Sequence, residues 1–222
     1  MTDTTPLPLS ALIRERTKDA HSSSEGAGFM SSLLRGERSR DDYIALVAQH
    51  FFIYAALESG ADRMREDPIA ARFITNRLTR LPAIEADLEF LLGPDWRDRI
   101  TALDATARYA TRIEQVAETW PGGFVAHHYT RYLGDLSGGL HIGRVIKRQF
   151  GFDTNGARFY VFDDVADPTE FKNAYREQLD DAPWAEDERE RVIAEVLCAY
   201  RFNTEVFEQL AEAHSPGGVV VG

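Results

Sequence analysis

Apolar residues recur at helical spacing along almost the entire chain, and no segment alternates apolar and polar residues for long. This periodicity predicts helices over residues 8–24, 29–34, 81–92, 101–119, 168–179 and 183–214. It also predicts a long helix that begins after a cap at Asp41 or Asp42 and ends near residue 65. Residues 44–57 are apolar on nearly every side, so we expect the long helix to be the buried centre of the molecule.

The remaining segments are predicted as connections. Residues 121–123, Pro-Gly-Gly, are expected to form a turn, and residues 151–167 are irregular, with a short extended segment at 159–162. No repeat, low-complexity segment or linker divides the chain. The sequence therefore predicts an all-α protein with a single domain over residues 1–222. This domain is expected to be a compact multi-helix bundle with an ordered core over about 9–212 and flexible tails at 1–8 and 213–222.

Composition narrows the choice of partners. The 222 residues carry a net charge of −11 with a pI near 5.0, which argues against nucleic acid as a partner. The one cysteine, Cys198, excludes an internal disulfide and any CxxC metal motif. The N-terminal residues lack the basic and apolar regions of a signal peptide, and the C-terminal residues are too few for a spanning helix. We therefore expect a cytoplasmic protein without a membrane anchor.

Residues 129–151, YTRYLGDLSGGLHIGRVIKRQFG, have the pattern of a long helix and yet contain four glycines. Each glycine inside a helix costs roughly 1 kcal/mol relative to alanine, so glycine here indicates close approach to the backbone or a bend. Gly134 and Gly138 are four residues apart and share one face of the helix. They predict a smooth strip on which a flat ligand could rest, or equally a seam where two helices pack closely.

Asp135 lies beside this strip among leucines, and such a carboxylate needs a partner or water. Arg131, four residues earlier on the same face, is a candidate ion-pair partner. The pair is either a surface salt bridge of little energetic value or part of a site in which the carboxylate organises water over a bound ligand.

Several kinds of chemistry lack their motifs. No Glu-x-x-His pair occurs, which argues against a di-iron bundle, and the HExxH, GxGxxG, Walker and GxSxG motifs are absent. An all-α chain with isolated histidines leaves non-covalent heme (haem, iron protoporphyrin IX) as the natural candidate, with one imidazole as axial ligand. Of the six histidines, His50 falls in the buried helix and His141 faces the same way as Gly134. His21 ends an amphipathic helix that also places Arg14, Lys18 and Glu25 near one face.

The glycine-bearing segment also resembles a known family. GDLSGG at 134–139, preceded by YTRYL, resembles the distal-helix motif of the heme oxygenases. Four further segments resemble that family in order: TKDAHSSSEGAGFM at 17–30, IYAALE at 53–58, FKNAYR at 171–176 and FNTEVFEQL at 202–210. The resemblance covers about residues 9–212. It implies one heme oxygenase domain, in which heme is sandwiched between a proximal helix and the glycine-rich distal helix.

The resemblance also assigns residue roles. His21 matches the axial ligand of the heme iron, and Glu25 matches the acid that hydrogen-bonds this histidine. Asp135 matches the carboxylate that holds a water network near bound O2, and its partners in that network are expected to be Tyr54, Arg131 and Asn203. The glycines whose backbone touches heme are expected to be Gly134, Gly138 and Gly139. The propionate side is expected to comprise Arg14, Lys18, Tyr129, Lys172 and Arg176, and Phe207 is expected to form part of the wall.

His127 matches a family histidine that does not bind the iron. Leu140 stands where the family often has glutamine, and His141 is an unusual neighbour. His141 therefore adds a second candidate ligand or a pH-sensitive group near the pocket.

The implied activity is that of a heme oxygenase. Heme, as both substrate and cofactor, is cleaved with O2 and reductant to biliverdin, ferrous iron and carbon monoxide, with attack expected at the α-meso carbon. A non-catalytic heme carrier or sensor remains an alternative, as does a purely structural glycine seam. The sequence leaves open whether the purpose is iron acquisition, detoxification or bilin supply.

The electrons must come from outside, because no flavin or iron–sulfur motif is present. Arg144, Lys147 and Arg148 lie at helical spacing just beyond the glycines. They form either a docking patch for an external donor or a solvated helix face. The donors expected are a ferredoxin with its reductase or a flavoprotein reductase.

Overall fold

The long apolar segment at 44–57 lies in helix α4 (Arg40–Met64), which forms the centre of the bundle. The structure, a computed structural model, describes residues 7–20 and 28–213. Tyr43, Leu46, Tyr54 and Leu57 of α4 are completely buried, as the sequence predicts for the central helix. By length and composition α4 could also cross a membrane, but 56% of its apolar window is buried inside the protein. Its apolar surface is therefore used in core packing.

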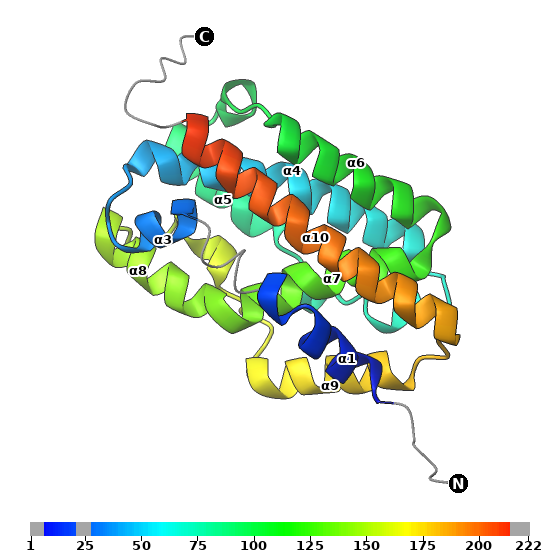
Figure 1. The fold of residues 1–222 in the computed structure, drawn as a ribbon. Coiled ribbons are helices and arrows are strands. Elements are labelled where there is room, and N and C mark those ends of the chain that lie inside the picture. The colour runs from blue at the N-terminus through cyan, green and yellow to red at the C-terminus, as the bar shows by residue number, and fades with distance from the viewer. Residues whose placement is uncertain (1–6, 21–27, 214–222) are drawn as a thin grey trace, which may run out of the picture.

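The other α-helices pack against α4 or against one another (Figure 1). They are α1 (Leu9–Arg16), α3 (Gly28–Leu34), α5 (Leu81–Leu92), α6 (Asp104–Thr119), α7 (Pro121–Gly134), α8 (Leu140–Phe150), α9 (Pro168–Asp181) and α10 (Glu186–Ala213). Helix α4 packs against α5 and α6, and α10 packs against α6, α7, α3 and α1. Helices α7 and α8 follow one another as a single long rod beneath α10. The described residues contain no strand, which confirms the all-α prediction.

Several helix boundaries differ from the sequence prediction. Helix α4 is capped by Ser39 rather than by Asp41 or Asp42: the Ser39 side chain accepts from the Asp42 backbone N–H, and the Asp42 carboxylate accepts from the Ser39 backbone N–H at 2.7 Å. This reciprocal capping box satisfies two backbone donors at once. The first predicted helix is interrupted at Thr17, and α6 begins at Asp104 rather than at residue 101.

The turn predicted at 121–123 is wrong. Pro121 is instead the first residue of α7, where its missing N–H costs nothing. Gly122 and Gly123 lie inside the helix. Glycine is required at both positions, because side chains of Trp120 and Glu188 occupy the space that a Cβ atom would need. The extended segment predicted at 159–162 is also wrong at its start, because Arg158–Tyr160 forms one 3-10 turn.

The loop that contains this turn is held by a buried carboxylate. Asp87 of α5 is completely buried and accepts hydrogen bonds from the backbone N–H groups of Gly156 (2.6 Å), Arg158 (3.0 Å) and Phe159 (2.9 Å). Arg80, at the start of α5, donates to the carbonyl oxygens of Phe159 and Val161. These bonds fix the loop that carries Phe159 and Tyr160 to the functional site described below.

Replacing Asp87 is therefore expected to destabilise the whole protein. In Asp87→Ala three backbone donors lose a charged acceptor, and we expect the free energy of unfolding to fall by about 3 kcal/mol. Chemical denaturation of the heme-free protein measures this change. Exposed Asp62→Ala, on α4, serves as the control and is expected to change stability by less than about 0.5 kcal/mol. Equal stability of the two variants would contradict the anchoring role of Asp87.

The predicted tails, residues 1–8 and 213–222, lie almost entirely outside the described part of the chain. Their flexibility, and the assignment of all 222 residues to one domain, stay predictions.

Candidate active site

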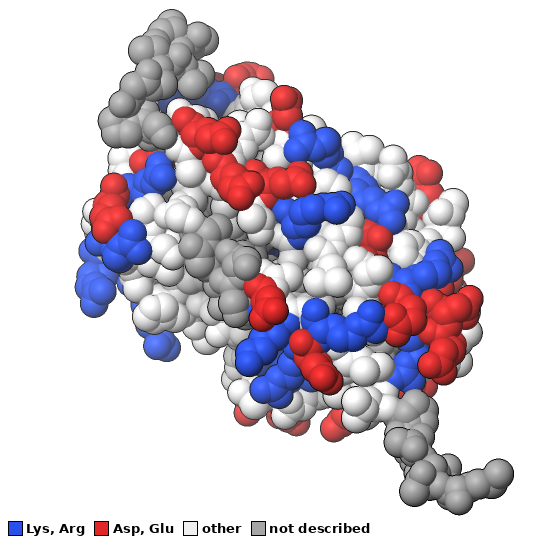
Figure 2. Space-filling model, viewed as in Figure 1, with Lys and Arg blue, Asp and Glu red and all other residues white. Residues whose placement is uncertain are grey.

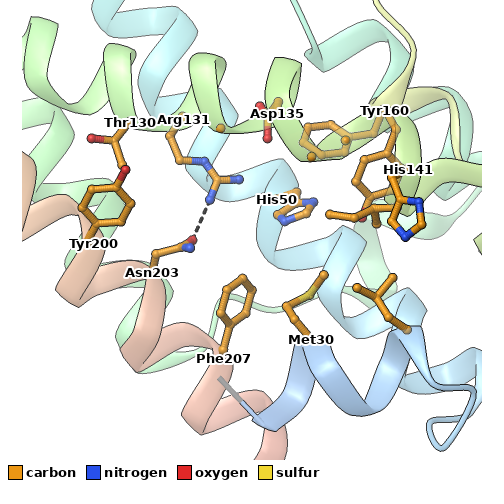
Figure 3. Close-up of a pocket in the computed structure, with 16 residues that line it drawn as sticks. Met30, His50, Thr130, Arg131, Asp135, His141, Tyr160, Tyr200, Asn203 and Phe207 are labelled. Carbon is orange, nitrogen blue, oxygen red and sulfur yellow. Dashed lines mark hydrogen bonds between the residues drawn. The ribbon is translucent and has the colours of Figure 1, made fainter. Parts of the chain in front are cut away.

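A cleft follows one side of the rod formed by α7 and α8. Its first cavity, of about 310 Å³, has α7 and α8 as its roof, α3 and α10 as its floor and α4 behind (Figure 3). A second cavity, of about 930 Å³, lies beside α1 and α9. Thr130, Gly134 and Tyr200 line both cavities, so the two form one continuous cleft along the middle of the rod.

The rod changes its winding where it passes over the cleft. Asp135–Gly139 form a π-helical turn, η4, between α7 and α8. Such a wide turn bends a helix and is frequent at functional sites. A Cβ atom added to Gly134 would have no other atom within 4 Å, and one added to Gly138 would meet only Ile142 Cδ1, at 3.8 Å. These two glycines thus expose their backbone to the cleft, as predicted for a strip that supports a flat ligand.

The other two glycines of the segment are explained by packing. A Cβ atom on Gly143 would lie 2.8 Å from Tyr160 Cβ, and one on Gly139 would lie 3.4 Å from Tyr160 Cδ1. The backbone of Gly139 nevertheless lines the first cavity, where the sequence places it. Gly139 and Gly143 therefore pack against Tyr160, whereas Gly134 and Gly138 face open space, and the use of that space by a flat ligand stays a prediction.

The four residues predicted to form a polar network are brought together. Tyr54 of α4 donates its hydroxyl to the Asp135 carboxylate, and Arg131 Nε lies 3.3 Å from the Tyr54 hydroxyl oxygen. Arg131 Nη1 donates to Asn203 Oδ1 of α10 at 2.7 Å (Figure 3). The direct ion pair expected between Arg131 and Asp135 is replaced by this chain, in which the Tyr54 hydroxyl links the two side chains. Three helices thereby hold the carboxylate in one position.

Burial changes the protonation behaviour of this network. It raises the pKa of the Asp135 carboxyl above its ordinary value, although the charge of Arg131 and the hydrogen bond from Tyr54 oppose this effect. Burial likewise raises the pKa of Tyr54 well above its ordinary value, so its hydroxyl stays protonated and can donate at neutral pH. The chain therefore has one direction, with Tyr54 as donor and Asp135 as acceptor.

Cations surround the second cavity. Arg14 and Lys18 reach it from the α1 side, and Tyr129 of α7 and Arg176 of α9 complete this wall. Figure 2 shows basic side chains over the neighbouring parts of α1 and α9. Lys172 lines neither cavity but donates to Ser137 Oγ at 3.0 Å, and Ser137 lines the second cavity. On a chain with net charge −11, this local positive charge suits the carboxylates of a ligand.

The first cavity has a mostly apolar wall. Phe207 of α10 contributes to it, as predicted, and is 8% exposed. The sequence prediction missed other wall residues, which are Met30, Leu34, His50, Thr130, Ile142, Phe159, Tyr160 and Tyr200. Periodicity gave no signal for Phe159 and Tyr160, because they belong to the irregular loop that only the Asp87 and Arg80 contacts bring to the cleft.

The predicted axial ligand His21 and its partner Glu25 lie outside the described residues. The chain reaches this segment from Lys18, which lines the second cavity, and continues after it to Met30, which lines the first. The described residues on both sides of the segment therefore lie at the cleft.

The histidines of α7 are buried and neutral. His127 is completely buried, and its Nε2 lies 2.8 Å from Glu195 Oε1. Burial lowers the pKa of His127 although the Glu195 carboxylate opposes this, so the neutral ring carries its proton on Nε2 and donates it to the carboxylate. Neighbouring His128 lies 2.9 Å from the Tyr175 hydroxyl, and burial lowers its pKa to about 3. His141 lines the first cavity and is otherwise exposed.

These buried histidines predict acid sensitivity. A histidine with a lowered pKa in the folded state binds fewer protons than in the unfolded chain, so stability falls as the pH drops below about 6.5. The pKa of His128 is about 3 in the folded protein and about 6.5 in the unfolded chain. This difference alone is expected to lower the free energy of unfolding by about 2 kcal/mol at pH 5. Urea denaturation between pH 7.5 and pH 5 measures the slope. His128→Gln, which can still bond Tyr175, should flatten it, and an unchanged slope would exclude His128 as a source.

The described residues fit a flat, largely apolar ligand that carries carboxylates. Two glycines leave the space that a Cβ atom would fill, aromatic and aliphatic side chains form the wall, and cations stand at one end. These are the features that an iron porphyrin with two propionates requires.

Comparison with known proteins agrees with this interpretation. A model of the heme oxygenase family matches residues 7–209. The chain is 40% identical over 204 residues to a heme oxygenase of the pufferfish Takifugu rubripes, covering 91% of this chain and 74% of the relative. It is 36% identical over 202 residues to heme oxygenase 1 of the cyanobacterium Synechocystis, covering 91% and 84%.

Solved structures agree at the level of the fold. The crystal structure of Synechocystis heme oxygenase-1 in complex with heme superposes with a TM-score of 0.88 at 35% identity, covering 93% of each chain. Synechocystis heme oxygenase-2, in complex with heme and NO, gives a TM-score of 0.89 at 30% identity, covering 93% of this chain and 86% of that one. The cleft, the glycines in its roof and these similarities lead to one conclusion: the chain belongs to the heme oxygenase family.

Proposed function

We propose that this protein binds heme in the cleft and cleaves it, with O2 and external electrons, to biliverdin, ferrous iron and carbon monoxide. Heme supplies the iron that binds O2 and, as the substrate, also supplies the carbon that is oxidised. The observation that carries the proposal is the hydrogen-bond chain from Asn203 through Arg131 and Tyr54 to Asp135. It ends in a carboxylate beside the two open glycines, at the position where O2 chemistry has to be directed.

The proposed heme-binding residues lie on two sides of the ligand, one that binds the iron and one that faces O2. His21 is proposed as the axial ligand of the iron, with Glu25 accepting a hydrogen bond from its second ring nitrogen. Phe207 covers the ring from the floor of the first cavity, and Gly134, Gly138 and Gly139 present backbone on the side opposite His21. Asp135 holds water there, because its carboxylate can accept from water while Tyr54 and Arg131 keep it in place. Water can supply protons without placing a side-chain acid next to bound O2.

The cations of the second cavity orient the ligand. Arg14, Lys18 and Arg176 are proposed to bind the propionates, with Tyr129 and Lys172 beside them. A porphyrin held by its propionates at one end cannot rotate in the cleft, so the same meso carbon is presented at each turnover. We propose the α-meso position.

A heme carrier or sensor is the alternative from another functional class. It would use the same axial ligand and propionate cations. It would have no need of a carboxylate that three helices hold beside the open glycines, and this feature favours the enzyme.

An optical spectrum tests the proposal directly. One equivalent of hemin is added to the purified protein, and the spectrum is followed after ascorbate is added in air. We expect a Soret band of histidine-ligated heme, and then its replacement by the broad red absorption of biliverdin. A Soret band that never decays would favour the carrier, and no Soret shift would refute heme binding.

The electron donor is proposed to dock on α8. Arg144 and Arg148 are exposed, Lys147 is half-buried, and none of them forms a salt bridge with a carboxylate of residues 7–20 or 28–213. These free cations lie just beyond the glycine segment and suit an acidic partner such as a ferredoxin, with its reductase, or a flavoprotein reductase. Figure 2 shows basic side chains along this edge of the molecule.

Charge reversal tests this docking face. We expect the triple variant Arg144→Glu, Lys147→Glu, Arg148→Glu to reduce heme at least about tenfold more slowly with a ferredoxin as donor, and to lose the salt dependence of the rate. Reduction by dithionite, which needs no docking, should stay normal. Arg63→Glu, an exposed change at the end of α4, is the control. Equal rates in both variants would place the donor elsewhere.

We also propose a cytoplasmic location. The lone Cys198 is free and half-buried, which suits a reducing compartment. Recovery of the protein in a membrane or periplasmic fraction of the cell would contradict this proposal.

A further inference from the structure

His50 is a polar residue that lines the first cavity. It lies in the middle of α4, is 7% exposed and lines the cavity. Figure 3 shows its ring between Arg131 and His141, directed into the space above Phe207 and Met30. The ring packs on Phe159 with 4.6 Å between centroids. Its Nδ1 atom is buried and has no hydrogen-bond partner among the described residues.

Packing alone does not explain a histidine at this place. Burial and the nearby charge of Arg131 keep the pKa of His50 well below its ordinary value, so the ring is neutral, with one N–H donor and one acceptor nitrogen. A buried polar atom without a partner costs free energy, whereas a leucine would pack against the same apolar neighbours at no such cost. Nδ1 is closed off from the cavity as well, so the other ring nitrogen, Nε2, is the atom that can take a partner from within the cavity.

The cavity has both the room and the polar surroundings for water. A single water needs about 10–15 Å³ of such space and two to four polar partners. The cavity measures about 310 Å³, and Arg131 and Asp135 line it together with His50. The titratable or charged side chains that line this cavity with His50 are Arg131, Asp135, His141, Tyr160 and Tyr200. Tyr54 joins them through its hydrogen bond to Asp135.

We propose that His50 holds an ordered water on the α4 side of the first cavity, and that this water extends the hydrogen-bond chain of Asn203, Arg131, Tyr54 and Asp135 across the cavity. His50 is thus a positioning residue, which acts through the water it holds. The use of this water in heme cleavage rests on the proposed function, whereas the water site itself does not. A second anchored water gives the distal side a hydrogen-bond donor that the glycine backbone cannot provide.

The first arm of the test needs no heme. High-resolution crystal structures of the heme-free full chain are compared for the wild type, His50→Leu and His50→Gln. We expect a water bonded to a His50 ring nitrogen, its loss in His50→Leu and its return in His50→Gln. A wild-type cavity without this water, or the same water in His50→Leu, overturns the proposal.

The second arm uses the ferric heme complex and measures the pH midpoint of its acid–alkaline optical transition. A donor water stabilises the alkaline form, so we expect His50→Leu to raise the midpoint by about 1 pH unit and His50→Gln to restore it. Arg63→Glu, an exposed change at the end of α4 that lines neither cavity, is the control and should leave the midpoint in place. Equal midpoints in wild type and His50→Leu overturn the proposal. If the wild type binds no heme, the proposed function fails, and the heme-free structures still decide the water site.

Discussion

Asp135→Ala is expected to bind heme with nearly normal affinity and to form biliverdin about 10²-fold more slowly than the wild type, the size of effect typical for loss of a group that manages proton transfer. The reason is geometric. The Asp135 carboxylate ends a hydrogen-bond chain through Tyr54 and Arg131 and lies beside the open backbone of Gly134 and Gly138. Without it, the water beside bound O2 loses its fixed acceptor.

The measurement is the initial rate of biliverdin appearance with ascorbate or ferredoxin as reductant, together with the heme dissociation constant. Tyr54→Phe is the matched variant. It keeps the carboxylate but removes the hydroxyl that holds it, so we expect a smaller loss of rate and unchanged heme affinity. A normal biliverdin yield from Asp135→Ala would refute the role of the carboxylate. It would also remove the feature that favours the enzyme over a heme carrier.

Gly134→Leu is expected to weaken heme binding by about 10- to 100-fold, the equivalent of the 1–3 kcal/mol typical of an overfilled site. Its heme-free form should be as stable as the wild type or more so. Gly134 has ordinary helical angles, φ −61° and ψ −51°, and open space at the Cβ position. The Cβ atom of a side chain there would have no neighbour within 4 Å. The substitution also removes the cost of glycine in a helix, but the side chain enters the space proposed for the ligand.

Gly143→Ala supplies the opposite case. Its Cβ atom would lie 2.8 Å from Tyr160 Cβ, and the backbone beside Tyr160 is held by Asp87 and Arg80. We expect the heme-free protein to lose about 1–3 kcal/mol of stability. Hemin titrations and chemical denaturation of both variants provide the comparison. If Gly134→Leu destabilises the heme-free fold and leaves heme affinity intact, the strip is a packing seam and not a ligand surface.

Much of the fold is encoded locally and could be predicted from the sequence. The apolar run at 44–57 can be buried on all sides only inside a bundle, and α4 occupies that position. Pro82 and Gly93 mark the limits of α5 as expected. The predictions failed where a residue has two local uses, as at Pro121, which starts a helix as readily as it forms a turn.

The candidate site shows the same division. The sequence alone determined the glycine-bearing segment and the family resemblance, because helical spacing and a specific motif are local properties of the chain. The members of the polar network followed from that resemblance. Only the tertiary structure decided that Arg131 reaches Asp135 through Tyr54, and that Gly134 and Gly138 face open space while Gly143 packs on Tyr160. It alone brought His50 and the loop carrying Phe159 to the same cavity. These contacts join residues that are distant in the chain, and helical periodicity records which face a residue occupies but not what lies opposite that face.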